Sequence, residues 1–468
     1  MLELAAQTAI ERYRPMENID KAIRIRRDII DDNEFGRFIE TAAGIIYPER
    51  PLAASDIRSL WRDYLKEKKR DDILSLYIHI PFCSSVCSFC SCYSHLGSAS
   101  DIRSYAKKLV EHISRSREVF DGAVFDTLYI GGGTPSIMDD GDFNDVINTV
   151  FSNFKFSDEG QRCSEMNPLT ASIQKMKMLK EHGFTRLSFG AQSFDAEVLA
   201  LNGRGYQTEA MVRKAITDAR TSGFKYINLD LIVGLYGDTS DKLVESFRRA
   251  LSVGVQRISL YALQPLRSYL QERFHSNLGE FDRFWKGLLD GSLERISQMA
   301  KEAGFSVPDY SKWYLKMSDC ASWSYQYRGV PSEEKEYIPQ GPGRSVFAIG
   351  ENPTSRIDGV VNYRTEIFSG DPDQCTFVGD IRNEKKEMIN YLIGAFSMKS
   401  NLNLSEFKDV FKKDLLKEFD ISIGRLKALN AVRINGDELV LMTEDKKERA
   451  LHTLMFFDDK DIEKVIKK

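Results

Sequence analysis

Four cysteines fall within ten residues of one another, in the segment YIHIPFCSSVCSFCSCYSH. Cys83, Cys87 and Cys90 have C-x3-C-x2-C spacing, and Cys92 follows closely. Soft thiolates at such short spacing favour an iron–sulfur cluster or zinc. Zinc bound by all four cysteines is the alternative, although zinc modules normally offer two separated pairs. The seven cysteines of the chain are an odd number, which argues against a disulfide framework.

A four-iron cluster with only three cysteine ligands leaves one iron without a protein ligand. S-adenosylmethionine (SAM) can bind that iron through its amino and carboxylate groups and accept an electron at its sulfonium. Cleavage of SAM then yields a 5′-deoxyadenosyl radical, which abstracts unactivated hydrogens. The cysteine spacing therefore indicates a site for radical chemistry.

The same segment resembles the signature of the radical SAM superfamily. YIHIPFC…C.FC.C is similar to the HemN-like branch, which includes the oxygen-independent coproporphyrinogen III oxidases. The resemblance implies that Cys83, Cys87 and Cys90 hold a 4Fe-4S cluster and that Cys92 is not a ligand. For Cys92, a small buried residue of the loop is the alternative interpretation.

Three aromatic residues accompany the cysteines. Tyr77 and His79 occupy alternate positions of the preceding strand, so they share one face. The resemblance places this pair near the cluster and makes Tyr77 and Cys92 the candidate catalytic residues. It also gives Phe89, directly before Cys90, contact with the adenine side of SAM.

A glycine-rich turn follows the next predicted strand as GGGTP, with Gly131, Gly132, Gly133 and Thr134. Glycines lack side chains, so the backbone there can approach a ligand closely. It is not a phosphate-binding loop, because no GK[ST] follows. The resemblance assigns these four residues to the methionyl ammonium of SAM.

Further candidate residues for binding SAM lie at the ends of the later strands or shortly after them. A carboxylate such as that of Glu165 can hold an ammonium or ribose hydroxyls. The resemblance adds Gln192, Arg204 and Asp230 to the pocket. A polar network inside the barrel is the alternative for Gln192 and Asp230, and a solvated ion pair for Arg204. The remaining candidates at the end of the sixth strand are Tyr261 and Ala262.

Short apolar runs that alternate with helical spacing must position these residues. The predicted strands cover residues 74–80, 127–133, 162–167, 186–194, 227–235 and 257–263. Such alternation predicts an α/β fold with a parallel sheet. Six units favour a partial (β/α)6 barrel, the radical SAM barrel of the resembled family, with its site at the carboxyl ends of the strands.

Four segments are predicted along the chain. Residues 1–72 form a helical N-terminal extension and 73–270 the radical SAM core barrel. Residues 271–382 are irregular and aromatic-rich, and we expect them to receive the substrate or a second SAM. Residues 383–468 read as three helices and a hairpin around Asn435 and Gly436, which predicts a winged-helix-like, HemN-type domain.

The composition sets limits on the partners. A net charge of −4 gives no reason to expect nucleic acid or an anionic membrane. No uninterrupted apolar run predicts a transmembrane helix, and the first residues do not resemble a signal peptide. We therefore expect a cytoplasmic protein that acts on a small-molecule substrate. The radical chemistry calls for an external electron donor such as a flavodoxin or ferredoxin system.

The sequence departs from the porphyrinogen oxidases where the substrate is received. YALQPLRSY carries Gln264 where they have histidine, and their Asp-His-Phe-Ala motif becomes DYSKWYLK at 309–316. This favours a class C methyltransferase or cyclopropanase that uses two SAM molecules on an sp2 carbon of a planar substrate. The alternatives are oxidative decarboxylation of a porphyrinogen, as in coproporphyrinogen dehydrogenases, and a non-enzymatic heme-binding chaperone.

Overall fold

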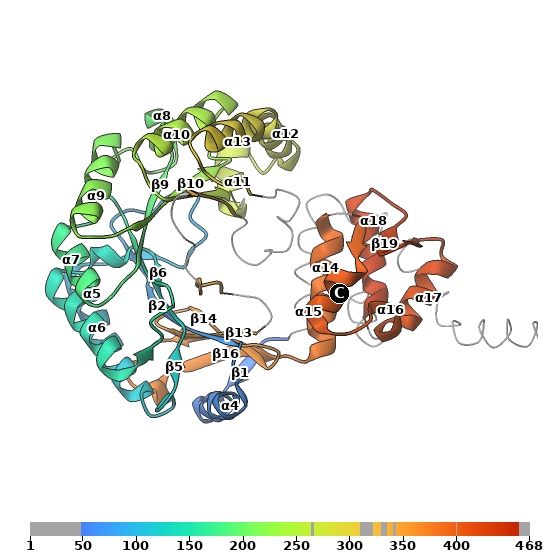
Figure 1. Cartoon of the computed structure of the whole chain (residues 1–468), viewed down its shortest axis with the longest axis horizontal. Coiled ribbons are helices and arrows are strands. Elements are labelled where there is room, and N and C mark those ends of the chain that lie inside the picture. Colours follow the sequence, from blue (N-terminus) through green and yellow to red (C-terminus); the bar gives the residue numbers. More distant parts are fainter. Residues whose placement is uncertain are drawn as a thin grey trace, which may run out of the picture. The chain divides into compact units, whose positions relative to one another are not determined.

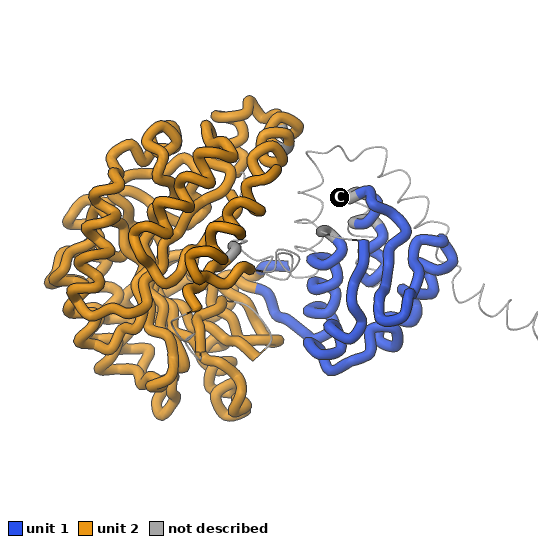
Figure 2. The backbone as a smooth tube through the Cα atoms, turned by 45° about the horizontal axis from the view of Figure 1, so that its top comes forward, with its two compact units in different colours: residues 1–49, 380–468 blue, residues 50–379 orange. Residues whose placement is uncertain are grey.

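The computed structural model describes residues 48–263, 266–308, 322–328, 335–339, 343–398 and 400–457. The chain divides into two compact units, residues 50–379 and residues 1–49 with 380–468 (Figure 2). The first unit contains both the predicted barrel and most of the segment predicted as irregular. Of the predicted N-terminal extension, residues 1–47 lie outside the described residues, and helix α4 (Ala54–Glu67) falls within its last part.

Six parallel strands form the centre of the larger unit, as the sequence predicted. They are β2 (Ile73–Ile80), β6 (Thr127–Gly132), β8 (Arg162–Met166), β9 (Arg186–Gln192), β10 (Tyr226–Val233) and β11 (Arg257–Ala262). Each pairs in parallel with the next in this order (Figure 1). Strand order therefore equals chain order, and every carboxyl end lies at the same edge of the sheet.

Helices connect these strands and cover one face of the sheet. They are α5 (Ala99–Ser116), α6 (Asp140–Asn153), α7 (Ile173–Glu181), α8 (Ala196–Leu201), α9 (Glu209–Thr221) and α10 (Ser240–Ser252). A capping box at Ser98 and Asp101 begins α5 by satisfying two free backbone N–H groups. A Thr208 side chain caps α9 in the same manner, by accepting from the N–H of Met211.

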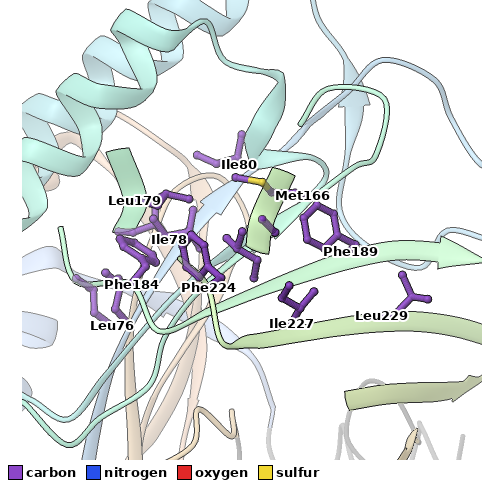
Figure 3. Packing of buried hydrophobic residues seen from close by; sticks show 14 of the residues in the cluster. Leu76, Ile78, Ile80, Met166, Leu179, Phe184, Phe189, Phe224, Ile227 and Leu229 are labelled. Atoms are coloured by element: carbon purple, nitrogen blue, oxygen red, sulfur yellow. The ribbon is translucent and has the colours of Figure 1, made fainter. Parts of the chain in front are cut away.

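The main core lies between the sheet and these helices. Leu76, Ile78 and Ile80 of β2 are fully buried and pack with Leu179 and Phe189 in this layer (Figure 3). Successive strand residues point to opposite faces. The residues between these three on β2, which include the candidate site residues, therefore face away from the helices.

The segment 271–382, predicted as irregular, contains regular elements in the structure. Its helices are α11 (Arg267–Phe274), which begins just before the segment, α12 (Leu278–Leu289) and α13 (Ser292–Glu302). Its strands are β12 (Ser322–Gln326), β13 (Arg344–Ile349), β14 (Thr354–Ile357), β15 (Val361–Ile367) and β16 (Thr376–Ile381). β12 pairs antiparallel with β11, and β13 pairs parallel with β2.

These additions extend the sheet at both edges to twelve strands, in the order β1-β16-β15-β14-β13-β2-β6-β8-β9-β10-β11-β12. Within the described part of the chain, β1 (Arg50–Leu52) and β12 are the two ends of this sheet. The sequence did not indicate this extension because short strands gain their stability from partners distant in the chain. Small ladders join β3 (Phe82–Cys83) with β4 (His95–Leu96) and β5 (Val124–Phe125) with β7 (Lys155–Phe156).

The smaller unit has the predicted winged-helix-like order. Its elements are α14 (Glu384–Met398), β17 (Asn401–Asn403), α15 (Leu404–Phe411), α16 (Leu415–Glu418), α17 (Asp420–Ala428), β18 (Val432–Asn435), β19 (Glu438–Leu441) and α18 (Lys446–Thr453). β18 and β19 form the predicted hairpin, in which Gly436 has φ +59°. The unit has its own core around Phe396, Leu426 and Phe456.

No helix in the described part of the chain is long and apolar enough to cross a membrane.

Removal of a central core ring tests the packing of the larger unit. Phe189→Ala should lower the free energy of unfolding by about 3–5 kcal/mol, because the fully buried ring leaves a cavity. Leu96→Ala is the control, since that side chain is 60% exposed, and it should change stability by less than about 0.5 kcal/mol. Urea denaturation followed by circular dichroism measures both. Equal effects would contradict the described core.

Candidate functional site

The cysteine loop begins where β2 ends. Cys83 is the last residue of β3, and Cys87, Cys90 and Cys92 follow in a loop without regular structure. None of the four forms a disulfide; the first three are partly buried and Cys92 is exposed. The exposure of Cys92 differs from the alternative interpretation of a small buried residue.

Contacts to neighbouring strand ends fix this loop. The Thr134 hydroxyl lies 3.4 Å from the Cys83 sulfur, and Arg204 Nε donates to the Cys87 sulfur at 3.2 Å. A Cβ at Gly133 would lie 3.0 Å from the Cys83 sulfur and 2.7 Å from the Phe82 carbonyl oxygen. The third glycine of GGGTP therefore lets the two loops approach each other.

The thiols differ in their tendency to ionise. Hydrogen bonding from Cys92 is the main cause that lowers the pKa of Cys90 to about 6, against the opposing effect of burial. Burial raises the pKa of Cys83, and the charges of Cys90 and Cys87 raise it further. Cys87 and Cys90 therefore lie close enough to Cys83 to affect its pKa. Thiolates are the ligands that iron–sulfur clusters require.

The donor set fits a 4Fe-4S cluster. Three partly buried thiols come from one short loop, and an arginine donates to one of them. Among the described residues, no three His, Cys, Asp or Glu side chains form a group that could hold a single metal ion. In a four-iron cluster each cysteine binds a different iron, which requires wider sulfur separations than one shared ion.

Phe89 anchors the cysteine loop by packing into a small apolar cluster. Its ring is 8% exposed and packs in a small cluster with Val198, Leu235 and Tyr269. This packing holds the residue before Cys90 against α8 and the end of β10. The predicted contact of Phe89 with adenine stays a prediction.

The glycine turn and Glu165 are in direct contact. Gly132 has φ +115°, and its N–H donates to Glu165 Oε2 at 3.2 Å. A Cβ at Gly131 would lie 3.0 Å from the carboxyl carbon of Glu165. The Gly133 N–H donates to the carbonyl oxygen of Ile80 at 2.8 Å, which ties the turn to the end of β2. The structure thus brings the glycine turn and Glu165 together beside the cysteine loop.

Two partly buried carboxyl groups face the interior of the barrel. Burial raises the pKa of Glu165 to about 7, although the Tyr129 hydroxyl donates to it at 2.7 Å and the Gly132 N–H also lowers the pKa. Burial likewise raises the pKa of Asp230 to about 6, against hydrogen bonds from Ser188 and Asn228. The charge of Asp230 adds to the rise at Glu165. A bound cation such as an ammonium would favour the ionised form of both.

Gln192 adopts a backbone conformation that is rare for its residue type. Its φ is +67°, and the β9–β10 register shifts beside it, between Asp230 and Leu231. A Cβ at Gly190 would lie 2.6 Å from the Gln192 side-chain nitrogen. Glycine at 190 therefore leaves room for the amide to turn back over the strand. Strained backbone of this kind concentrates at functional sites.

Arg204 connects the strained strand end with the cysteine loop. It is 8% exposed and donates to the Gly190 carbonyl oxygen at 2.6 Å and to Gln207 at 3.1 Å, besides Cys87. The predicted alternative of a solvated ion pair is wrong for this buried side chain. Its positive charge also favours the thiolate form of Cys90.

Tyr77 and His79 share the interior face, as the alternation predicted. The Tyr77 hydroxyl lies 3.1 Å from His79 Nδ1, and His79 Nε2 lies 2.9 Å from the Tyr93 carbonyl oxygen. A carbonyl oxygen can only accept, so the proton of the neutral ring belongs on Nε2. Nδ1 then accepts from the Tyr77 hydroxyl. Burial lowers the pKa of His79, which keeps the ring neutral. Burial is also the first cause that raises the pKa of Tyr77 well above its usual value.

Two predicted residues lie at the end of β11. Tyr261 and Ala262 pair with Ile232 and Val233 of β10 and are partly buried. Tyr261 is close enough to Tyr129 to affect its pKa. Their role in binding SAM stays a prediction.

Two residues of the site were not predicted from the sequence. Tyr129 donates to Glu165. Gln207 accepts from Arg204 and donates to the Ala191 carbonyl oxygen. Tyr129 is two residues before Gly131 on β6, so strict alternation along TLYIGG could have placed it on the site face. Gln207 gave no such signal, because it lies in a connection between two helices.

Two aromatic residues of the predicted substrate region, Tyr325 and Tyr327, lie away from the site. Tyr325 is fully buried against Phe247 of α10, with ring centroids 4.8 Å apart. Tyr327 packs against Phe305 at the opposite, amino-terminal end of the strands. Gln264 and the segment 309–316 lie outside the described residues.

Residues 77–250 match the sequence model described as the Radical SAM superfamily. With the parallel barrel and the three-thiol loop, this match establishes a radical SAM domain, whose family uses a 4Fe-4S cluster and SAM. The curated relatives support similarity to the HemN-like branch.

Two curated relatives illustrate this branch. The oxygen-independent coproporphyrinogen III oxidase of Pseudomonas aeruginosa is 32% identical over 54% of this chain and 56% of its own. The heme chaperone HemW of Bacillus subtilis is 34% identical over 40% of this chain and 50% of its own. The chain thus matches only about half the length of these relatives.

A solved structure extends the likeness in fold. The coproporphyrinogen III oxidase HemN of Escherichia coli, described as a radical SAM enzyme, superposes with a TM-score of 0.62. The match covers 83% of this chain and 91% of that one at 18% identity. Such identity shows a common fold and leaves the reaction open.

Replacement of single cysteines tests the assignment of the cluster ligands. Cys83→Ala, Cys87→Ala and Cys90→Ala should each lose most iron and the visible sulfur-to-iron absorption after anaerobic reconstitution, because each removes one thiolate. Cys92→Ala is the matched control and should keep both. Iron and sulfide analysis with absorption spectroscopy measures the result. Loss of the cluster in Cys92→Ala would show instead that all four thiols are needed.

The raised pKa of Glu165 predicts a pH effect on stability. Between the usual carboxyl pKa of about 4.3 and the folded value of about 7, the folded protein holds a proton that the unfolded chain has lost. Stability contributed by this group therefore falls as pH rises through that window. Glu165→Gln removes this titration. Between pH 5 and pH 7.5 the free energy of unfolding of the wild type should therefore fall by about 1–3 kcal/mol more than that of the variant.

Urea unfolding at several pH values measures this difference. Asp140→Asn is a suitable control, because that carboxylate is exposed. Parallel pH curves for wild type and Glu165→Gln would show that Glu165 titrates normally.

Proposed function

We propose that this chain is a radical SAM enzyme that transfers a methyl or methylene group to an sp2 carbon of a planar small molecule, using two SAM molecules. The observation that carries the proposal is the joint placement of three free thiols, the glycine turn and Glu165 at one edge of the parallel sheet. The proposed cluster ligands are Cys83, Cys87 and Cys90. When bound, the cluster and SAM supply a 5′-deoxyadenosyl radical.

The protein's own residues bind and orient SAM in this proposal. The Gly132 N–H and the Tyr129 hydroxyl already donate to the Glu165 carboxylate and fix it. This carboxylate would accept a hydrogen bond from the ammonium group of SAM. Asp230 and the strained Gln192 would bind the remaining polar groups. Arg204 would stabilise the thiolate of Cys87, to which it donates at 3.2 Å. An external reductant such as a flavodoxin or ferredoxin would deliver the electron.

The choice of reaction rests on the sequence departures. Gln264 stands where the porphyrinogen oxidases carry histidine, and DYSKWYLK replaces their Asp-His-Phe-Ala motif. The radical-forming residues are retained while the substrate-receiving ones differ, which favours another substrate. In the proposed reaction the abstracted hydrogen comes from the methyl group of the second SAM.

Two further candidates follow from the relatives. Likeness to a coproporphyrinogen III oxidase supports oxidative decarboxylation of a porphyrinogen, in which hydrogen leaves a propionate β-carbon. Likeness to a heme chaperone supports heme binding without turnover. These candidates differ in the source of the hydrogen and in the need for heme.

Methyl-deuterated SAM distinguishes these reactions. The reconstituted protein is incubated anaerobically with dithionite and deuterated SAM, and products are identified by mass spectrometry. Deuterium in 5′-deoxyadenosine, together with S-adenosylhomocysteine, is the expected result, because the second SAM donates the hydrogen. Cys83→Ala is the control and should form neither product.

Other outcomes support the other candidates. Undeuterated 5′-deoxyadenosine that increases with coproporphyrinogen would support decarboxylation. Stoichiometric heme binding without any 5′-deoxyadenosine would support the chaperone. Equal behaviour of wild type and Cys83→Ala would contradict the radical mechanism.

A further inference from the structure

A short segment, residues 335–339, crosses the amino-terminal end of the barrel, opposite the cysteine loop. The Gln161 N–H, just before β8, donates to the Lys335 carbonyl oxygen at 2.9 Å. The Tyr337 N–H donates in return to Gln161 Oε1 at 3.1 Å. The Lys335 ammonium pairs at 2.6 Å with Asp126, which directly precedes β6. The segment is therefore fixed to the first residues of two neighbouring strands.

Glu336 fixes the same segment to further strands. Its carboxylate pairs with Arg186 at 3.0 Å and with Arg257, the first residues of β9 and β11. Arg344, the first residue of β13, donates to the Glu336 carbonyl oxygen at 3.0 Å. Burial opposes ionisation, but the two arginines lower the pKa of Glu336, so this anchor keeps its charge. Because the two arginines are largely buried, loss of Glu336 would leave their charges without this partner, which is costly.

Tyr337 then extends into the barrel and stacks on two other tyrosines. Its ring centroid lies 4.7 Å from that of Tyr129 at an interplanar angle of 26°, and 6.0 Å from that of Tyr77 at 15°. Tyr77 and Tyr129 are themselves stacked at 6.1 Å. The three rings thus form one cluster in which Tyr337 is the nearer aromatic neighbour of Tyr129, whose hydroxyl donates to Glu165 at 2.7 Å.

We propose that Tyr337 is a positioning residue for the SAM site: from the amino-terminal end of the barrel it fixes the Tyr129 ring, so that the Tyr129 hydroxyl stays directed at Glu165. This inference rests on the proposed function, because it takes Glu165 to be a SAM-binding residue. The Tyr337 ring stacks on Tyr129 and on Tyr77, and Tyr129 is the one of the two that donates to Glu165. The influence of Tyr337 on SAM passes through Tyr129.

A double-mutant cycle on SAM affinity tests the link. Equilibrium dialysis measures the Kd for SAM of the full-length, cluster-reconstituted protein without reductant, so turnover plays no part. Tyr129→Phe should weaken binding about fivefold, in line with one lost hydrogen bond. Tyr337→Leu should weaken it about three- to fivefold, whereas Tyr337→Phe keeps the ring and should remain within about twofold of wild type.

The double variant decides between positioning and a general structural role. If Tyr337 acts through Tyr129, then Tyr337→Leu should have no further effect in the Tyr129→Phe background. Additive losses would overturn the proposal. Tyr327→Leu is the matched control, because Tyr327 lies at the same end of the strands but packs on Phe305, and it should leave the Kd unchanged.

The pH profile of SAM binding supplies a second measurement. The Tyr129 hydrogen bond lowers the pKa of Glu165, so its loss should move the midpoint of binding to higher pH. Tyr337→Leu should move the midpoint in the same direction, and Tyr327→Leu should not. An unchanged midpoint in Tyr337→Leu, with normal movement in Tyr129→Phe, would overturn the proposal.

Two remaining outcomes are also decisive. If Tyr337→Leu does not fold, Glu336→Gln replaces it, because that change loosens the segment and keeps the Tyr337 ring; its effect should likewise vanish in the Tyr129→Phe background. Wild-type protein that holds its cluster but binds no SAM would overturn both this inference and the proposed function. Normal SAM binding that is insensitive to Tyr337 and Glu336 would overturn the inference alone.

Discussion

In each parallel strand, successive residues alternate between the helix-covered face of the sheet and its opposite face. On β2 this pleat sends Leu76, Ile78 and Ile80 into the apolar layer and leaves Tyr77 and His79 for the barrel interior. The helices can cover only one face, so polar and aromatic side chains gather on the other. Because all six strands run in the same direction, the residues at their carboxyl ends form one site.

Charged groups of both signs lie near one another in that interior. Glu165 and Asp230 are partly buried, repel each other when both are ionised, and have raised pKa values of about 7 and 6. Nearby, Arg204 donates to Cys87 and favours thiolates. Carboxylates beside a thiolate loop are costly in an empty interior, and a cationic ligand would offset that cost. SAM, with its ammonium and sulfonium groups, has the matching charge.

The site is held from both ends of the barrel. At the carboxyl end, backbone hydrogen bonds join the glycine turn to β2, and Arg204 joins β9 to the cysteine loop. At the amino end, residues 335–339 connect the first residues of several strands through Glu336 and Lys335. Preorganisation of this kind keeps binding groups in place before a ligand arrives.

The sequence alone determined the six parallel strands, the ligand spacing and the hairpin of the smaller unit, because apolar alternation, cysteine spacing and turn residues are local signals. Tertiary structure decided the rest. The pairing of β13 with β2, the stacking of Tyr337 on Tyr129, and the contact of Arg204 with Cys87 join residues far apart in the chain. No local pattern encodes which distant partner a buried tyrosine or arginine meets, since packing of the whole barrel selects it.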